Sequence, residues 1–261
     1  MLQTRIHDIH AQIEGETMAE AIRLLVGLFP GQVAFSTSFG HEDQVISDVI
    51  FENRLSVRVF TLDTGRMFEE TYQTYYETIE KYRQVIEVYH PESQAVGNLL
   101  TEKGPYSFYD SVENRKECCH IRKIVPLKRA LQGVKIWITG LRGGQSENRQ
   151  QMPALEWDEG NQLIKYNPLI DWTLEKVEAY INQNRVPYNK LYNKGFKSIG
   201  CAPCTRAIEP GEDLRAGRWW WEESKKECGL HSLPTSPTPA RPKREGEKIV
   251  SFESTKPTRA V

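Results

Sequence analysis

No cysteine precedes Cys118 in this 261-residue chain, and no apolar run reaches the length of a membrane span. A transmembrane helix needs roughly 18 or more apolar residues in succession, so we expect no membrane partner. The amino-terminal stretch alternates charged with apolar residues and lacks the apolar core and cleavage site of a signal peptide. We therefore expect a cytoplasmic protein.

The chain also has almost no net charge, because 34 Lys and Arg residues balance 35 Asp and Glu residues. General nucleic-acid and membrane-surface binders carry an excess of basic residues. We therefore expect no nucleic-acid partner, although a local basic pocket remains compatible with this balance. The length suits one sizeable hydrophobic core with extensions.

The five cysteines are unevenly placed. Cys118 and Cys119 are adjacent, Cys201 and Cys204 are separated by two residues, and Cys228 stands apart. In a reducing compartment, closely spaced cysteines are more often metal ligands or redox groups than structural disulfides. The pattern predicts one site with four thiolates and one free thiol.

Short apolar runs that end in turn residues alternate with stretches of helical periodicity. Strands that alternate with helices of this length imply right-handed βαβ crossovers and a parallel sheet. The fold class is therefore predicted to be α/β. The expected strands are 33–38, 57–64, 85–90 and 135–140, and the expected helices between them are 42–51, 68–83 and 111–131.

Further elements are expected on either side of this alternation. Apolar spacing predicts helix over about 5–28, and 153–169 reads as a hairpin packed beside the sheet. Thr173 caps an amphipathic helix over 173–186. Residues 232–261 hold five prolines, six Lys or Arg and one aromatic residue, so they cannot bury enough apolar surface and are expected to be disordered.

Three loops that follow strands, 36–43, 62–68 and 139–149, combine Gly with Ser or Thr. Ligands of parallel sheets bind at the carboxyl ends of strands, where backbone N–H groups and hydroxyls can surround an anion. Arg142 and Arg149 add guanidinium groups, which bind phosphate or sulfate through two hydrogen bonds. The sequence predicts an anion site at this sheet edge.

The motif S-x-S-F-G-x-E-D over 36–43, followed by L-D-T-G over 62–65, resembles the phosphate loop of the adenylyl-sulfate and phosphoadenylyl-sulfate reductase family. Related ATP pyrophosphatases carry S-G-G-x-D-S there. The resemblance implies an adenine nucleotide alpha hydrolase-like fold of the PP-loop type: a parallel sheet with a mixed edge, helices on both faces, and a flexible C-terminal segment. It also implies that the nucleotide site is lined by Ser36, Ser38, Gly40 and Glu42, with Leu62 and Gly65 beside the adenine and ribose.

The two cysteine pairs favour a cluster over a single ion. Adjacent helical residues point about 100° apart, so Cys118 and Cys119 cannot easily reach one small ion. Zinc and a disulfide within the C-x-x-C pair are the alternatives. The motifs C-C-x-x-R-K (118–123) and G-C-x-P-C-T (200–205) resemble those of reductases whose four cysteines ligate a 4Fe–4S cluster. That resemblance places Lys123 between cluster and substrate.

The motif E-C-G-L-H over 227–231 resembles the one that carries the family's nucleophile, which implies this role for Cys228. His231 is expected to help bind or position an anion, and Arg215 and Arg218 match substrate-clamping arginines. The expected thiolate attack on adenylyl sulfate displaces AMP and leaves a cysteine S-sulfonate. Because no spare cysteine remains, we expect thioredoxin or a glutaredoxin-like thiol donor to release sulfite.

The resemblance implies a role in assimilatory sulfate reduction and cysteine biosynthesis, and we also expect a homo-oligomer. Three alternatives remain open: reduction of the 3′-phosphorylated nucleotide, sulfur transfer to tRNA by a PP-loop enzyme, and a non-catalytic iron–sulfur sensor. The expected division is an N-terminal helical extension (1–30), a nucleotide- and cluster-binding domain (31–204), a mobile catalytic segment (205–231) and a disordered tail (232–261).

Overall fold

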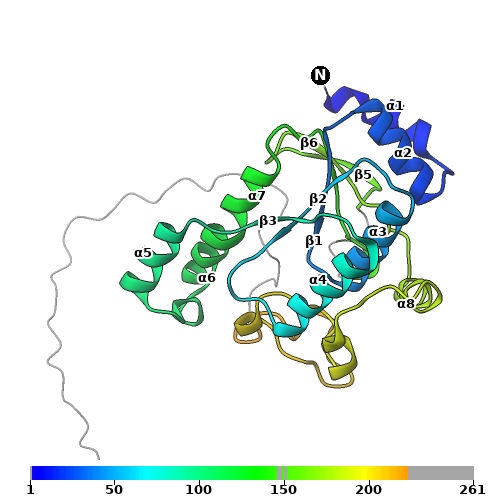
Figure 1. Cartoon of the computed structure of the whole chain (residues 1–261). Coiled ribbons are helices and arrows are strands. Elements are labelled where there is room, and N and C mark those ends of the chain that lie inside the picture. Colours follow the sequence, from blue (N-terminus) through cyan, green and yellow to red (C-terminus); the bar gives the residue numbers. More distant parts are fainter. Residues whose placement is uncertain (1, 146–148, 150–151, 223–261) are drawn as a thin grey trace, which may run out of the picture.

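The computed structural model describes residues 2–145, 149 and 152–222. Within them, six strands form one sheet in the order β3-β2-β1-β4-β6-β5 (Figure 1). Each strand pairing is parallel except that of β5 with β6, which is antiparallel. The predicted α/β sheet with a mixed edge is confirmed. The strands are β1 (Val33–Thr37), β2 (Arg58–Leu62), β3 (Glu87–Tyr89), β4 (Ile136–Ile138), β5 (Leu155–Asp158) and β6 (Leu163–Tyr166).

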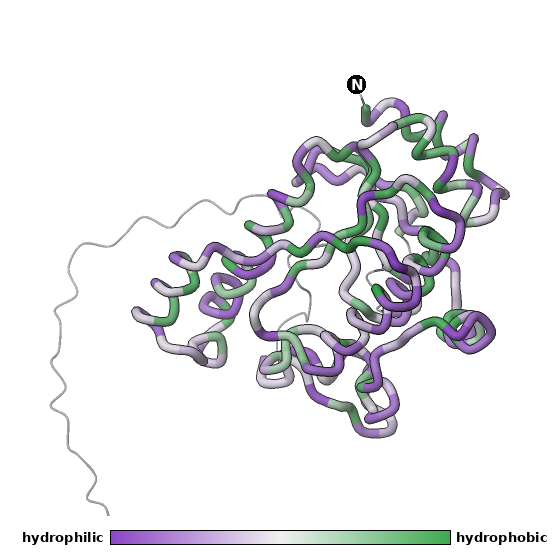
Figure 2. The backbone as a smooth tube through the Cα atoms, in the orientation of Figure 1, coloured by the Kyte–Doolittle hydropathy of each residue, from purple (hydrophilic) through white to green (hydrophobic). Residues whose placement is uncertain are grey.

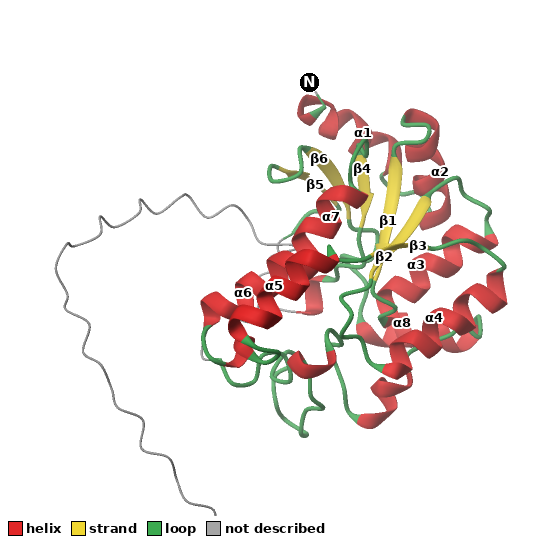
Figure 3. Ribbon diagram, turned by 60° about the vertical axis from the view of Figure 1, so that its left-hand side comes forward, coloured by secondary structure: helices red, strands yellow, loops and turns green. Residues whose placement is uncertain are grey.

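Helices cover both faces of this sheet (Figure 3). One side carries α1 (Ile6–Ile13), α2 (Met18–Leu28), α3 (His41–Glu52), α4 (Glu69–Tyr82) and α8 (Leu174–Gln183), and the other carries α5 (Ser93–Lys103), α6 (Val112–Cys119) and α7 (Val125–Ala130). Hydrophobic and hydrophilic residues alternate along helices such as α4 and α8 (Figure 2), as expected for helices packed by one face. No helix of the described part is long and apolar enough to cross a membrane.

Alternation along the strands builds two hydrophobic cores. Phe35 in β1 faces the larger core, which includes Ile22 of α2 and Ile46 of α3. Its neighbour Ala34 faces the smaller core on the other side of the sheet, together with Leu127 of α7. Successive strand residues point to opposite faces, so the central strands are buried on both sides and read as continuous apolar runs.

The amino-terminal helical stretch, expected over 5–28, is two helices instead of one. The hydroxyl of Thr17 accepts a hydrogen bond from the backbone N–H of Glu20, and the Glu20 carboxylate accepts one from the N–H of Thr17. This capping box begins a new helix. Ile9 and Ile22 are fully buried in the larger core, so both helices pack in the same core as the sheet. The proposed division into domains stays a prediction.

The helix expected over 111–131 is also interrupted. α6 ends at Cys119 and continues as a π-helical turn, η3 (His120–Ile124), before α7 begins. Such wide turns are frequent at functional sites because they re-aim the side chains that follow. Here the turn comes directly after the Cys118–Cys119 pair and contains Lys123.

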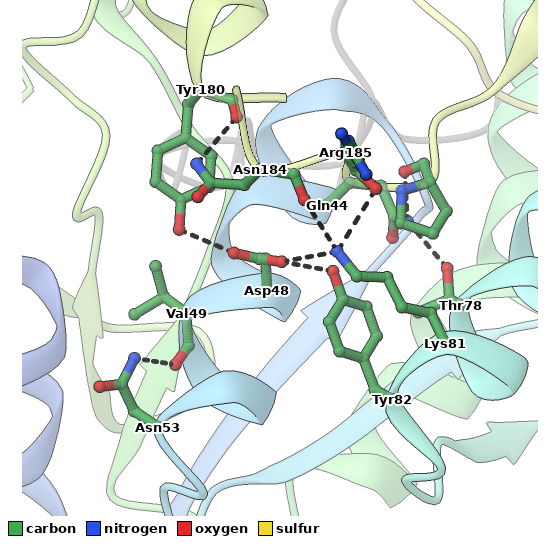
Figure 4. Close-up of polar contacts among 11 residues, drawn as sticks. Gln44, Asp48, Val49, Asn53, Thr78, Lys81, Tyr82, Tyr180, Asn184 and Arg185 are labelled. Atoms are coloured by element: carbon green, nitrogen blue, oxygen red, sulfur yellow. Dashed lines mark hydrogen bonds and ion pairs between the residues drawn. The ribbon is translucent and has the colours of Figure 1, made fainter. Parts of the chain in front are cut away.

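A buried carboxylate joins three helices on one side of the sheet (Figure 4). Asp48 of α3 accepts hydrogen bonds from the hydroxyls of Tyr82 on α4, at 2.5 Å, and Tyr180 on α8, at 2.8 Å. The ammonium of Lys81 lies 3.2 Å from the same carboxylate and also donates to the carbonyl of Asn184. This network positions α3, whose first turn borders the cavity described below.

Replacing Asp48 by alanine is expected to lower the free energy of unfolding by about 3 kcal/mol, because it leaves two half-buried tyrosine hydroxyls without their acceptor and the Lys81 ammonium without its counter-charge. Urea unfolding followed by circular dichroism measures the change. The exposed Asp171, replaced in the same way, is the control and should cost less than about 0.5 kcal/mol. Equal losses in the two variants would contradict a stabilising network.

Candidate active site

A cavity of about 490 Å³ lies at the carboxyl ends of β1, β2 and β4, where its lining includes Ser38, Thr64 and Thr139. This is the sheet edge at which the sequence predicts an anion site. All the residues predicted to bind substrate line it except Gly65: Ser36, Ser38, Gly40, Glu42, Leu62, Arg142, Arg149, Arg215 and Arg218. Chain segments far apart in sequence therefore meet around one space.

The loop between β1 and α3 is held by a buried carboxylate that the sequence interpretation did not single out. Asp43 accepts two hydrogen bonds from Ser38, from its backbone N–H and its hydroxyl, both at 2.6 Å. Gly140 makes room for it, since a Cβ there would lie 2.0 Å from Asp43 Oδ1. The Ser38 hydroxyl is therefore engaged by Asp43. The Glu42–Asp43 pair in the loop motif was the feature of the sequence that could have identified this carboxylate.

Burial raises the pKa of Asp43 to about 6, against the opposing effect of the Ser38 hydrogen bonds. A raised carboxyl pKa means that the folded state binds the proton more tightly. The resulting stabilisation is complete below the ordinary pKa of 3.8 and is lost as the pH rises through about 6.

The unfolding free energy of the wild type, relative to Asp43→Asn, is therefore expected to fall between pH 4 and pH 7. Denaturant titrations of both proteins at several pH values would measure the difference. A constant difference across this range would contradict the assignment, since only the wild type carries a titrating group at this position.

Ser36 is oriented by a tryptophan of the neighbouring strand. The indole N–H of Trp137 donates to Ser36 Oγ at 2.9 Å, and both side chains line the cavity. A hydroxyl that accepts this bond can still donate its own proton to an anion. The ammonium of Lys165 lies 5.6 Å from the centre of the Trp137 ring. Trp137 was missed because its apolar surroundings in β4 identify it as a core residue.

The predicted arginines of the third loop are also held by protein partners. Arg142 Nε lies 3.0 Å from Glu42 Oε1, and both side chains are buried. Arg149 donates to the side-chain oxygen of Gln145 at 2.5 Å. Glu42, predicted to line the nucleotide site, lines the larger cavity with its charge paired. An unpaired carboxylate would repel an anionic ligand, so this pairing suits the predicted site.

His41 is a further cavity residue that the sequence interpretation missed. Its ring stacks on Tyr192, with centroids 3.5 Å apart, and its backbone N–H donates to the Tyr192 hydroxyl. Burial lowers the pKa of His41 to about 4, so the imidazole is neutral at neutral pH. Neither ring nitrogen has a hydrogen-bond partner among the residues that the structure describes.

A second, much smaller cavity of about 20 Å³ is lined by all four paired cysteines: Cys118, Cys119, Cys201 and Cys204. These four are free thiols. Cys201 and Lys123 line both this cavity and the larger one. The Sγ of Cys201 lies 3.3 Å from the hydroxyl of Thr64, at the end of β2. The fold therefore brings the two cysteine pairs together and sets them beside the larger cavity.

The protein around the thiols is cationic. Burial and the neighbouring Cys201 raise the pKa of Cys204 to about 12, while Lys123 and Arg218 act in the opposite direction. Burial also raises the pKa of Cys118. Buried thiols with raised pKa values are poor nucleophiles. Positively charged side chains that line the thiol cavity are Arg66, Arg115, Arg122 and Lys123.

The donor set around the cysteines fits an anionic sulfur cluster. Arg122 Nε and the indole nitrogens of Trp219 and Trp221 are buried without a hydrogen-bond partner in the described part of the chain. Both tryptophans belong to one hydrophobic group of side chains that also includes Cys118, Cys201 and Cys204. Cationic and N–H groups around a cluster stabilise its charge and tune its properties. The described residues contain no set of three His, Cys, Asp or Glu side chains placed to hold a single metal ion. The fit therefore rests on the four thiols that line the cavity and on the cationic and N–H groups around them.

Residues 205–222 fold back and bring two predicted arginines to the larger cavity. Thr205 pairs with Arg218 as an isolated antiparallel bridge, and Arg218 donates to Ser198. Gly200 permits this approach, since a Cβ there would lie 2.4 Å from Arg218 Nη2. Arg215 lines the same cavity. Cys228, His231 and the tail 232–261 lie outside the described residues.

The segment is anchored at its end by a buried ion pair. Arg115 of α6 donates to both carboxylate oxygens of Glu222, at 2.9 Å each. The hydrogen bond to Glu222 raises the pKa of Arg115, and the guanidinium also lies over the ring of Trp219. Because Arg115 lines the thiol cavity, this ion pair connects the C-terminal segment to the cysteine site.

Residues 32–207 match the family model described as the phosphoadenosine phosphosulfate reductase domain, and the chain belongs to this family. It is 51% identical over 206 residues to the adenosine 5′-phosphosulfate reductase of Allochromatium vinosum, covering 78% of this chain and 80% of that protein. The protein of the same name from Agrobacterium fabrum is 46% identical over 232 residues, covering 88% and 89%.

Solved structures agree with this assignment. The phosphoadenylyl-sulfate reductase of Candida auris, a phosphate complex, has a TM-score of 0.66 at 30% identity, covering 79% of this chain and 97% of that one. The FMN adenylyltransferase of Candida glabrata with FAD and pyrophosphate has a TM-score of 0.50 at 15% identity, a likeness in fold alone. The family and PP-loop-type fold predicted from the sequence are confirmed.

Proposed function

We propose that this protein is an adenylyl-sulfate reductase, which converts adenylyl sulfate to sulfite and AMP. The observation that carries the proposal is the shared wall of the two cavities: Lys123 and Cys201 line both the predicted nucleotide cavity and the four-thiol cavity. The names of the curated relatives support adenylyl sulfate as the substrate.

The four thiols of the smaller cavity are proposed to hold a 4Fe–4S cluster. Four thiols around one space, with Arg115, Arg122 and Lys123 beside them, suit the negative charge of such a group. Bound there, the cluster would supply a fixed charge that couples electrostatically, through Lys123, to the substrate. Lys123 itself would orient and neutralise the sulfuryl group.

The chain's own residues would bind and position the nucleotide. Ser36, oriented by Trp137, donates a hydrogen bond from its hydroxyl to the phosphosulfate. Arginines offset the negative charge that develops on the departing AMP, and because protein partners hold them in place they need little reorganisation. The proposed set is Arg142, Arg149, Arg215 and Arg218.

Cys228 is proposed as the nucleophile, with His231 helping to bind or position the anion. The Cys228 thiolate attacks the sulfuryl sulfur, a sulfur–sulfur bond forms, and the sulfur–oxygen bond to the phosphate breaks. The electron pair of that bond leaves with AMP, so a cysteine S-sulfonate remains. Thioredoxin or a similar dithiol donor then releases sulfite by thiol–disulfide exchange.

Mixing the full-length, cluster-loaded protein with adenylyl sulfate in the absence of thiol tests the proposal. The expected result is about one AMP per chain and an added SO3 group on Cys228, found by peptide mass spectrometry. Reduced thioredoxin should then release sulfite. Failure to release AMP, or modification of a different cysteine, would contradict the mechanism.

The similarity to the Candida auris enzyme keeps the 3′-phosphorylated nucleotide as the second candidate substrate. Competition between the two nucleotides in one assay gives the ratio of their kcat/KM values. Adenylyl sulfate is expected to be preferred, because the paired cysteines resemble those of adenylyl-sulfate reductases. A preference for the 3′-phosphorylated nucleotide would reverse the assignment.

Replacing Trp137 by phenylalanine is expected to raise the KM for adenylyl sulfate about tenfold, because Ser36 loses the N–H that orients it while most of the ring is retained. Ser36→Ala and the double variant complete a double-mutant cycle. The double variant should be no worse than Ser36→Ala alone. Additive effects would show that Trp137 acts through packing and not through Ser36.

A further inference from the structure

An exposed group of aromatic side chains lies beside the thiol cavity. Tyr106 is 63% exposed, Tyr109 40% and Trp220 39%. Ring centroids of Tyr106 and Tyr109 are 6.3 Å apart, as are those of Tyr109 and Trp220. We call these three residues the aromatic patch. Its members come from two segments that are distant in sequence: the connection between α5 and α6, and the end of the described chain (Figure 1).

The aromatic patch is attached firmly to the cysteine site. The Tyr109 hydroxyl donates to the carbonyl of Pro203, inside the Cys201–Cys204 turn, at 2.8 Å. Its ring contacts Trp221 edge-on, with centroids 4.4 Å apart. Rigid, adjacent and exposed Tyr and Trp side chains are typical anchors of protein–protein interfaces. The patch therefore has the composition and the support of a docking surface.

The position of the patch along the chain indicates which partner it serves. Trp220 lies two residues before Glu222, which the buried Arg115 anchors. Cys228 follows Glu222 by six residues, and an extended chain spans at most about 3.6 Å per residue. The length of this connection therefore limits the distance between Cys228 and the anchor to about 22 Å. The aromatic patch is therefore within reach of a protein that reacts with Cys228.

We propose that the aromatic patch is the docking surface for the dithiol protein that reduces the S-sulfonate of Cys228; this rests on the proposed function. One thiolate of the donor attacks the Cys228 sulfur, and the sulfur–sulfur bond to the SO3 group breaks. Sulfite leaves with the electron pair of that bond. The second donor thiolate then attacks the mixed disulfide, so the donor is oxidised by two electrons and the Cys228 thiolate is restored.

The experiment uses the full-length, cluster-loaded protein with Tyr106→Ser and with the double change Tyr106→Ser and Trp220→Ser. Tyr76→Ser is the matched control, because Tyr76 is 56% exposed and lies on α4, on the other side of the sheet. Three quantities are measured: the KM for reduced thioredoxin, turnover driven by dithiothreitol, and the burst of AMP without thiol.

The patch variants are expected to raise the KM for thioredoxin about tenfold, a typical loss for one interface anchor. Their AMP burst and dithiothreitol-driven turnover should match those of the wild type and of Tyr76→Ser. An unchanged KM for thioredoxin would overturn the proposal. The proposal would also be overturned if dithiothreitol-driven turnover and the AMP burst fell as much as the KM for thioredoxin rose, because the patch would then have a purely structural role.

Light scattering tests the competing occupant, a second copy of this chain. Dissociation of an oligomer by the patch variants, with an unchanged KM for thioredoxin, would assign the patch to self-association and overturn the proposal. Failure of the wild type to release AMP would refute the proposed function itself, and the docking proposal with it. The two failures are therefore distinguishable.

Discussion

Replacing Cys228 by serine is expected to lower sulfite production on the order of 1,000-fold or more, while nucleotide binding and iron content stay at wild-type levels. A serine hydroxyl is a far weaker nucleophile than a thiolate, and removal of a covalent nucleophile has effects of this size. The other four cysteines cannot substitute, because they line the small cavity and have their proposed role there. Steady-state assay, nucleotide titration and iron analysis measure the three properties.

Cys204→Ser is the matched comparison for this variant. It is expected to lose activity as well, but by losing iron, since Cys204 is one of the four proposed ligands. The two serine variants would therefore share the loss of activity and differ in iron content. Sulfite production by Cys228→Ser at the wild-type rate would contradict the role of Cys228. Full iron content in Cys204→Ser would contradict the proposed ligand set.

Replacing Glu222 by alanine is expected to lower the free energy of unfolding by about 3 to 5 kcal/mol, because it leaves the buried Arg115 guanidinium without the carboxylate that accepts two of its hydrogen bonds. The two side chains are 4% and 3% exposed, so water cannot replace the lost partner. The same variant releases the anchor that precedes Cys228 in the chain, so the AMP burst is expected to slow too. Urea unfolding and rapid-quench measurement of AMP test the two effects.

Two controls make this prediction specific. The double variant Arg115→Met and Glu222→Leu removes both charges and is expected to recover much of the lost stability, since apolar pairs often replace buried ion pairs without loss. Glu80→Gln removes a partner from the exposed pair Arg83–Glu80, whose side chains are 74% and 43% exposed. It should cost under about 1 kcal/mol. If Glu80→Gln and Glu222→Ala lowered the free energy of unfolding equally, burial would not be the reason that the Arg115–Glu222 pair stabilises the fold.

Local patterns predicted most of the α/β scaffold. The strand runs, the hairpin of β5 and β6, and the helix capped by Thr173 all occur in the structure. Two predicted helical stretches proved to be interrupted, and the sequence interpretation missed both interruptions. The capping box at Thr17 begins a second helix in the first stretch, and a π-helical turn follows Cys119 in the second.

The residues predicted to bind substrate line the larger cavity, except Gly65, but the sequence did not predict the contacts between them. The motif named Ser38 and Glu42 as nucleotide-site residues, and both line the cavity. It did not show that Asp43 engages the Ser38 hydroxyl, or that Arg142 neutralises Glu42. Such pairings depend on side-chain directions in the packed loops, which residue type and spacing do not specify.

Residue pattern alone predicted the α/β order of elements, the loops at the sheet edge, and the separation of four paired cysteines from Cys228. Only the packed structure shows that Lys123 borders both cavities and that Arg115 holds Glu222, 107 residues further along the chain. It also shows that Tyr106 and Trp220 are exposed. Periodicity and motifs report on neighbours along the chain, whereas these contacts exist only once the sheet and its helices have packed.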